Sequence, residues 1–171
     1  MAAATRRWAG MLVGAAAVAL LAAPAHAKPD LVVSKLSNPP ASLRAGDELR
    51  LKVTVRNKGR RTAKRSAVGF YLSTGKRRSR DAQALTGRLN AKKLKRRKKA
   101  SGSAQLTVPP DADPGSYRVI ACADDRRKVR ERNERNNCRA SRSNVRIEPS
   151  GPAFGPLTPA SPAPPVAGPS G

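Results

Sequence analysis

Apolar and polar side chains alternate along several short stretches of the chain. The longest such stretch runs from Leu49 to Arg56, where the alternation continues for eight residues. A period of two is typical of a strand with one buried and one exposed face. Similar but shorter patterns predict six further strands, of which the first and third are weaker. They lie at 31–33, 68–72, 85–89, 104–108, 117–123 and 145–147.

Turn-forming residues separate many of these stretches. Clear examples are Asn-Pro-Pro at 38–40, Asn-Lys-Gly at 57–59 and Asp-Pro-Gly at 113–115, which favour tight connections between strands. No stretch has the periodicity of an amphipathic helix of useful length. The pattern therefore predicts an all-β protein, an immunoglobulin-like antiparallel β-sandwich of about seven strands in a single domain.

Both ends of the chain differ from this patterned middle. Residues 1–27 combine two arginines, an apolar stretch and Ala-His-Ala at 25–27, which predicts a cleaved secretory signal peptide and favours general secretion over the twin-arginine route. Residues 149–171 hold eight prolines and few residues to bury, which predicts a disordered proline-rich tail. We therefore expect a folded domain at 28–148, without a transmembrane segment, that is secreted or associated with the cell wall.

The two cysteines, Cys122 and Cys138, are expected to form a disulfide in an oxidising compartment. Counting from Tyr117, the odd positions of its strand face the core, so Cys122 faces away from it. The disulfide is therefore predicted to brace the connection after this strand, closing about 15 residues for about 3 kcal/mol of stability. Tyr117 itself has two interpretations, a tyrosine corner bonded to nearby backbone or an ordinary core aromatic.

Positive charge dominates the composition. The chain has 35 Lys and Arg against 11 Asp and Glu, for a net charge of +24, and removal of the signal peptide leaves +22. Four basic runs stand out, at 56–65, 76–80, 92–99 and 126–135. In an immunoglobulin-like topology three of them, all except 76–80, occupy connections that emerge at one end of the sandwich.

We therefore expect a basic end, and Asp47, Glu48, Asp111 and Asp113 at the opposite end. The candidate binding residues are Arg60, Arg61, Lys64, Arg65, Lys92, Lys93, Lys95, Arg96, Arg97, Lys98, Lys99, Arg126, Arg127 and Lys128.

A basic surface of this kind is suited to bind polymers with closely spaced anionic groups, because counterions released from the polymer drive its association with the protein. Anionic polymers of the cell envelope or other proteins are the expected partners. Sequence-specific nucleic acid is not, since no helix or reading motif accompanies the charge.

Catalytic equipment is not evident in the predicted mature chain. The only histidine of the sequence, His26, falls in the predicted signal peptide, and the predicted mature chain has no free cysteine or phosphate-binding glycine loop. We therefore expect no enzyme activity, no catalytic residue, no metal and no cofactor. The alternatives are a structural spacer without a specific ligand and, more remotely, a hydrolytic enzyme.

Several segments resemble the CARDB family, a bacterial cell-adhesion-related domain. They read Pro-Asp-Leu-Val-Val at 29–33, Val-Thr-Val-Arg-Asn-Lys-Gly at 53–59, Phe-Tyr-Leu-Ser at 70–73, Pro-Gly-Ser-Tyr at 114–117, Ala-Cys-Ala-Asp at 121–124 and Val-Arg-Glu-Arg-Asn-Glu-Arg-Asn-Asn-Cys at 129–138. The last segment is the most specific. The resemblance implies an extracellular immunoglobulin-like module for adhesion or protein contacts that is not an enzyme. Such modules often have an aspartate-rich loop where 75–80 is basic here, so a calcium site is not carried over.

The polar segment before the last strand has two interpretations. Its Glu and Asn side chains can form an oxygen-rich ion or ligand site, or they can bond loop backbone and shape a turn. The second is favoured, because the cations between 126 and 135 oppose a bound cation. The residues in question are Glu131, Asn133, Glu134, Asn136 and Asn137.

Overall fold

Ten strands form within residues 27–149, the part of the chain that the computed structural model describes. Most of the predicted signal peptide and nearly all of the predicted tail lie outside these residues. The strands are β1 (Leu31–Leu36), β2 (Ser42–Arg44), β3 (Glu48–Asn57), β4 (Ser66–Ser73), β5 (Gln83–Ala84), β6 (Leu89–Ala91), β7 (Lys99–Thr107), β8 (Gly115–Cys122), β9 (Cys138–Ala140) and β10 (Val145–Glu148). The described residues contain no helix that is long and apolar enough to cross a membrane.

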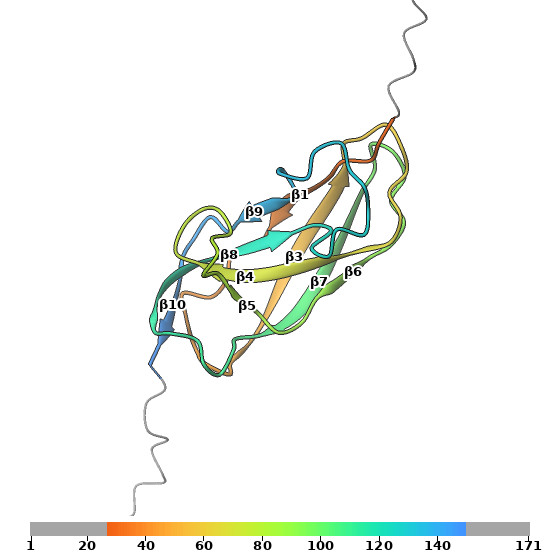
Figure 1. Cartoon of the computed structure of the whole chain (residues 1–171). Helices are drawn as coiled ribbons and strands as arrows, with labels where there is room; N and C mark the ends of the chain where they lie inside the picture. Colours follow the sequence, from red (N-terminus) through yellow and green to blue (C-terminus); the bar gives the residue numbers. More distant parts are fainter. Residues whose placement is uncertain (1–26, 150–171) are drawn as a thin grey trace, which may run out of the picture.

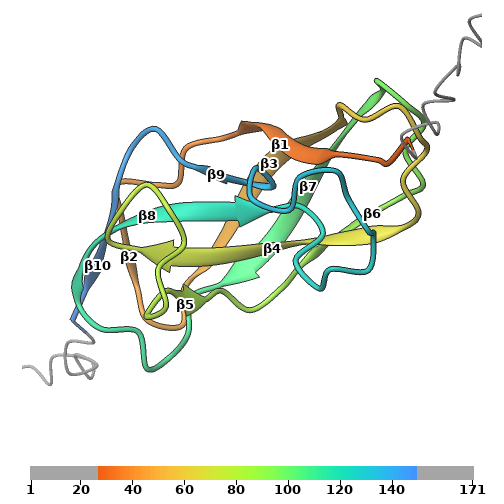
Figure 2. The ribbon, with the colours of Figure 1, turned by 45° about the horizontal axis from the view of Figure 1, so that its top comes forward.

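The strands are arranged in two sheets packed face to face (Figures 1 and 2). One sheet has the order β1-β3-β7, and the other has the order β2-β10-β8-β4-β5, with β6 also paired to β4 and β9 to β8. Every pairing between these strands is antiparallel except that of β2 with β10. The predicted all-β, immunoglobulin-like sandwich is confirmed, and the additional strands are short segments at its edges.

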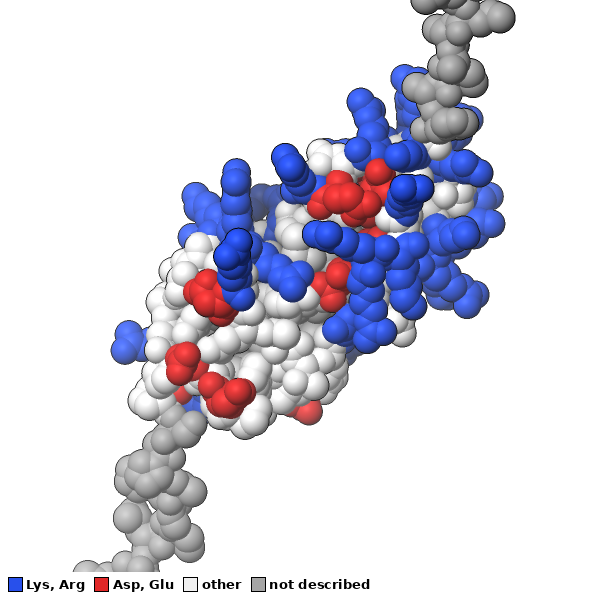
Figure 3. Space-filling view, viewed as in Figure 1, with Lys and Arg blue, Asp and Glu red and all other residues white. Residues whose placement is uncertain are grey.

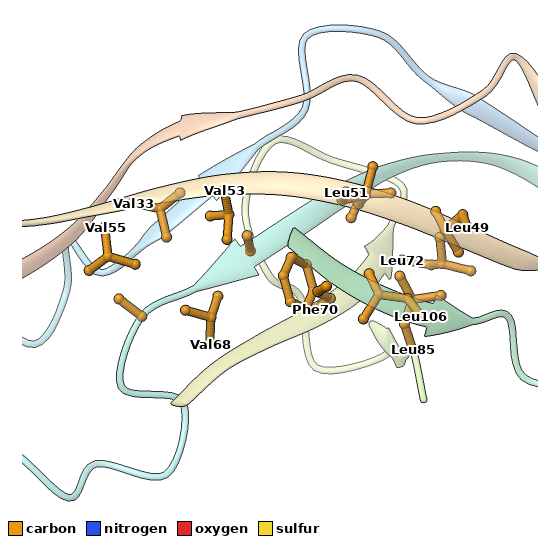
Figure 4. Packing of buried hydrophobic residues seen from close by; sticks show 14 of the residues in the cluster. Val33, Leu49, Leu51, Val53, Val55, Val68, Phe70, Leu72, Leu85 and Leu106 are labelled. Carbon is orange, nitrogen blue, oxygen red and sulfur yellow. The ribbon is translucent and has the colours of Figure 1, made fainter. Parts of the chain in front are cut away.

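The core lies between the sheets and is built from the alternating positions of the sequence pattern. From β3 it takes Leu49, Leu51, Val53 and Val55, which face Val68, Phe70 and Leu72 of β4 (Figure 4). Leu51, Val53 and Val68 are fully buried. Burial of these apolar faces is the main stabilising contribution to the sandwich. The long antiparallel pairing of β3 with β7 fixes the register of these two strands in the β1-β3-β7 sheet.

The prediction of one continuous strand at 85–89 is wrong. The chain forms two short strands instead, β5 before this segment and β6 from its last residue onward, and both pair with β4. Between them, Thr86 pairs with Thr107 in the other sheet. Gly87 permits this crossing, since its φ is +106° and a Cβ there would lie 2.4 Å from the Gln105 carbonyl oxygen. Leu85 still enters the core, which explains why its apolar pattern resembled a strand.

Tyr117 forms the tyrosine corner that was one of its two interpretations. Its hydroxyl donates to the carbonyl oxygen of Asp113, at 3.0 Å, while its ring packs against the main core. This contact ties the turn before β8 to the strand itself.

The disulfide joins Cys122 of β8 to Cys138 of β9, as predicted. The two residues are cross-strand partners, with their Cα atoms 4.0 Å apart. Val119 and Ala121 belong to the main core, whereas Cys122 packs with Tyr71 and Ile120 in a separate cluster on the outer face of the sheet. The predicted orientation of Cys122 is therefore confirmed, and the bridge closes the loop at 123–137.

Candidate functional site

Lys and Arg side chains gather at the end of the sandwich where the described chain begins (Figure 3). Three connections meet at this end, namely the β3–β4 loop (58–65), the β6–β7 loop (92–98) and the β8–β9 loop (123–137). The first two are hydrogen-bonded to each other through the backbones of Ala63 and Leu94, at 2.9 and 3.1 Å. We call this surface the basic end.

Asn57 holds the first two loops and the start of β1 in place. Its side chain is fully buried, and its Oδ1 accepts the backbone N–H groups of Asp30 and Gly59 at 3.1 and 2.9 Å. Its Nδ2 donates to the carbonyl oxygens of Arg61 and Leu94 at 2.8 and 3.1 Å. One amide therefore satisfies backbone groups of three segments, which explains the Asn-Lys-Gly motif as a structural element.

Gly59 completes that motif by close approach to the N-terminal segment. A Cβ at this position would lie 2.4 Å from the carbonyl oxygen of Lys28 and 2.6 Å from backbone atoms of Pro29. Only glycine leaves this space, so residues 28–30 pack directly on the β3–β4 loop.

The β8–β9 loop is shaped by its own carboxylates. Asp124 is buried, and its side chain accepts the backbone N–H groups of Lys128 and Val129 at 3.1 and 2.8 Å. The N–H of Arg132 donates to the carbonyl oxygen of Pro29 at 2.8 Å. Val129 is buried in the core, so the cations on either side of it, Lys128 and Arg130, are displayed at the surface.

Glu131 lies in the same loop and connects it to β1. Its carboxylate accepts the N–H of Leu31 and, at 3.0 Å, an N–H of the Asn137 side chain. Burial raises its pKa to about 7, and the nearby carboxylates of Glu134 and Asp124 act in the same direction. The two hydrogen bonds favour the ionised form and oppose this shift.

The other polar residues of this segment also bond within the protein. Glu134 accepts the N–H of Glu131, Asn133 accepts the N–H of Arg135, and the Asn136 side chain donates to Asp30. These contacts support the structural interpretation of the segment. Within residues 27–149, no group of three or more His, Cys, Asp or Glu side chains is arranged to hold a metal ion.

Two grooves cross the basic end. The first has a volume of about 520 Å³ and its lining includes five cations, contributed by Arg65, Arg88, Lys92, Arg126 and Lys128. The second, of about 440 Å³, also has five, from Lys28, Arg61, Lys64, Lys128 and Arg130. Lys128 lines both, and neither lining includes Asp or Glu. The grooves therefore adjoin at Lys128 and share a lining rich in Lys and Arg.

The structure brings part of the candidate set together in these grooves. Six candidates line them, namely Arg61, Lys64, Arg65, Lys92, Arg126 and Lys128. The remaining eight are exposed on the same loops or at the first residue of β7 but do not line either groove: Arg60, Lys93, Lys95, Arg96, Arg97, Lys98, Lys99 and Arg127.

Three groove residues were missed by sequence reasoning: Lys28, Arg88 and Arg130. Arg130 stands in a basic run and was within reach of the pattern. Lys28 and Arg88 stand outside the four runs, and nothing in the sequence marks them.

Arg88 is oriented by Asp125, whose side chain is 5% exposed. Asp125 pairs with Arg88 at 3.0 Å and with Arg78 at 3.3 Å, and it accepts the hydroxyl of Tyr71. Arg78 also stacks over the Tyr71 ring, 3.8 Å from its centroid. Burial and the bond to Asp125 raise the pKa of Tyr71 to about 12. Within residues 27–149, none of the candidate cations forms an ion pair.

Four acidic residues lie at the other end of the sandwich. The β2–β3 and β7–β8 turns meet there, because Gly46 and Val108 are joined by a backbone hydrogen bond at 3.1 Å, and Val108 also donates to Asp47 at 2.9 Å. These turns and the start of β3 carry Asp47, Glu48, Asp111 and Asp113. Lys and Arg are thus dense at the basic end and sparse at this end, whereas Asp and Glu occur at both ends (Figure 3).

A family model and several solved structures match this chain. The CARDB family model matches residues 28–141. The CARDB domain of a Pyrococcus furiosus protein, crystallised in complex with di-metal ions, has 21% identity and a TM-score of 0.48, with 71% of this chain and 90% of that chain covered. A domain of a protein described as a candidate cell surface protein from Methanosarcina acetivorans has 20% identity, a TM-score of 0.48, and coverage of 71% and 93%.

A β-glucosidase from Erythrobacter marinus has 18% identity and a TM-score of 0.44, with 70% of this chain but only 16% of that chain covered. No curated protein matches the sequence.

Proposed function

Because the chain belongs to the CARDB family, we propose that it is a cell-surface adhesion module that binds repeating anionic polymers of the cell envelope along its basic end. The observation that carries the proposal is the pair of adjoining grooves, lined by nine different cations and by no carboxylate. Clustered like charges above a low-dielectric protein raise the local concentration of a polyanion and speed its association.

Rigidity of the loops favours binding. The groove cations extend from backbone that is held by Asn57, by the Asp124 carboxylate and by the disulfide. A scaffold that is already ordered loses less conformational entropy when a ligand binds. An elongated polymer with one phosphate or carboxylate per unit can then contact several cations in succession, since Lys128 belongs to both grooves.

The groove linings favour binding without chemistry. They combine Lys and Arg with Ser, Thr, Asn and apolar residues, and they include no His, Cys, Asp or Glu. A hydroxyl without a nearby general base is a weak nucleophile. The proposed role is therefore adhesion, in a protein exported by the signal peptide predicted at 1–27.

A structural spacer is the second candidate, and one observation favours it. The described part of the chain begins at one end of the sandwich and finishes, after β10, at the opposite end (Figure 1). A module with this arrangement can separate two segments of a chain without binding any ligand at its basic end.

Salt-dependent retention on immobilised polyphosphate distinguishes the two candidates. We expect the purified protein to elute at high salt, because each phosphate contact adds about 0.7 to 0.9 to the slope of log affinity against log salt concentration. The K64Q/K92Q/K128Q variant, which removes three exposed cations from the groove linings, should elute at markedly lower salt.

The matched control removes three charges elsewhere. K76Q/R77Q/R80Q alters the β4–β5 loop, which follows the end of β4 that is farther from the basic end. Its elution should stay close to that of the parent. Equal losses for the two variants would show that net charge alone drives retention, and a parent that is not retained at moderate salt would favour the spacer.

A further inference from the structure

A third cavity lies beside the cationic grooves, between the edges of the two sheets. It has a volume of about 240 Å³ and lies where β6 of one sheet faces β7 of the other. Its inner wall is formed by Leu31, Val55 and Leu94, which are at most 7% exposed. We call it the edge pocket.

Side-chain size along β7 explains why the edge pocket exists. The inward positions of this strand carry Leu106 and Ala104 deep in the core, and then Gly102 and Ala100 toward the basic end. Ala100 is paired with Val55 across the sheet, and both line the pocket. Gly102 lets Leu89 of β6 pack directly on β7, since a Cβ there would lie 2.9 Å from Leu89 Cδ2. Beyond it, Ala100 is small and exposed, so the space beside Val55 is left unfilled.

Two cations flank this apolar space. Lys64 and Lys92 line the edge pocket, and both are exposed. Lys92 also lines the first groove and Lys64 the second. No Asp or Glu lines the pocket. A ligand that fits both parts therefore has an anionic group next to an apolar chain.

We infer that the edge pocket receives one acyl chain of a phosphate-headed membrane lipid, with the phosphate held by Lys64 and Lys92. The head-group part of this inference rests on the proposed function, because Lys64 and Lys92 also line the grooves. The acyl-chain part does not depend on it. Polar contacts at the mouth fix the orientation, and apolar burial supplies affinity. If one methylene group occupies about the same volume as one water molecule, about 30 Å³, the pocket of about 240 Å³ has room for a chain of roughly eight carbons.

A series of alkyl phosphates tests the inference on the purified protein. Calorimetric titration with butyl, hexyl, octyl and dodecyl phosphate, each below its micelle concentration, should give affinities that rise about fourfold per methylene. The rise should stop at about the length that fills the pocket. Affinities that are independent of chain length would overturn the inference, even if the protein is still retained on polyphosphate. Loss of both would overturn the proposed function as well.

Two variants separate the chain site from the head-group site. A100L fills the edge pocket and should abolish the gain with chain length while leaving retention on polyphosphate unchanged. A41L is its control, since Ala41 is exposed like Ala100 but lies in the connection between β1 and β2 and does not line the pocket. K64Q/K92Q should weaken all alkyl phosphates by a similar factor and preserve the gain per methylene.

Sedimentation of the parent and A100L tests the main competing occupant. A pocket filled by a second copy of the chain would make the parent a dimer and A100L a monomer, which would contradict the inference. If A100L proves unfolded by circular dichroism, the chain-length series on the parent remains decisive by itself.

Discussion

Glu131 offers the sharpest test of the energetics of this domain. Its side chain is buried, with 5% of the residue exposed, and it links β1 to the β8–β9 loop through Leu31 and Asn137. Burial raises its pKa from an ordinary 4.5 to about 7. The folded protein therefore binds this proton more tightly than the unfolded chain does, and the carboxylate is less favourable in the fold when it is ionised.

The sign of the pH dependence follows from this difference. Stability contributed by the protonated group is fully present below pH 4.5, the unfolded value, and is lost as the pH rises through the folded value of about 7. One pKa unit corresponds to about 1.4 kcal/mol. The full effect is thus about 3 kcal/mol, and about 2 to 3 kcal/mol of it falls between pH 5 and pH 8.

Replacement of Glu131 by Gln removes the charge and keeps the shape of the side chain. The Gln oxygen can accept the N–H of Leu31. Once the Asn137 amide turns over so that its Oδ1 faces residue 131 in place of Nδ2, the Gln nitrogen can donate to this oxygen, which is buried without a partner in the parent. We expect E131Q to be about 2 kcal/mol more stable than the parent at pH 8, with the difference shrinking toward pH 5.

Urea unfolding of both proteins at a series of pH values, with the disulfide intact, measures this difference. A distant exposed carboxylate provides the control: E48Q, at the start of β3, should differ from its parent by an amount that changes much less with pH. A difference between E131Q and the parent that is constant from pH 5 to pH 8 would refute the reasoning. So would an E131Q protein that is less stable than the parent at pH 8.

Two further predictions concern the supports of the basic end. Asn57→Ala should lower the free energy of unfolding by about 3 kcal/mol, because the N–H groups of Asp30 and Gly59 and the Arg61 carbonyl lose their partner, while the Leu94 carbonyl keeps its bond to Ala63. Chemical denaturation checks this, and N90A, at the exposed position of β6, should change it by less than about 0.5 kcal/mol. The C122S/C138S variant should lose about 3 kcal/mol, since the bridge closes a loop of about 15 residues. Its β8–β9 loop should also be cut faster by trypsin, and equal cleavage rates would contradict the proposed bracing role.

Local patterns were sufficient for the architecture of the sandwich. The alternation from Leu49 to Arg56 predicts the buried face of β3, and the parity of Cys122 relative to Tyr117 predicts that the disulfide lies outside the core. Both inferences rest on the pleat, which places successive side chains on opposite faces whatever the rest of the chain does. The position of the basic loops followed from the order of the strands.

Other features depend on segments that are distant in the sequence. The interruption at 85–89 depends on Gln105, which approaches Gly87 from the other sheet. Arg88 becomes a groove residue through Asp125, and Lys28 does so because Gly59 admits the N-terminal segment.

Burial depends on the same kind of contact. In the sequence, nothing distinguishes Glu131 from the other polar residues of its basic run, yet its carboxylate accepts the N–H of Leu31, 100 residues away. Its raised pKa and the volume of the edge pocket both depend on what packs around a position in space. The pleat and the run of charges are local properties that a sequence displays directly, whereas desolvation and empty volume arise only when the two sheets and the loops of the basic end are brought together.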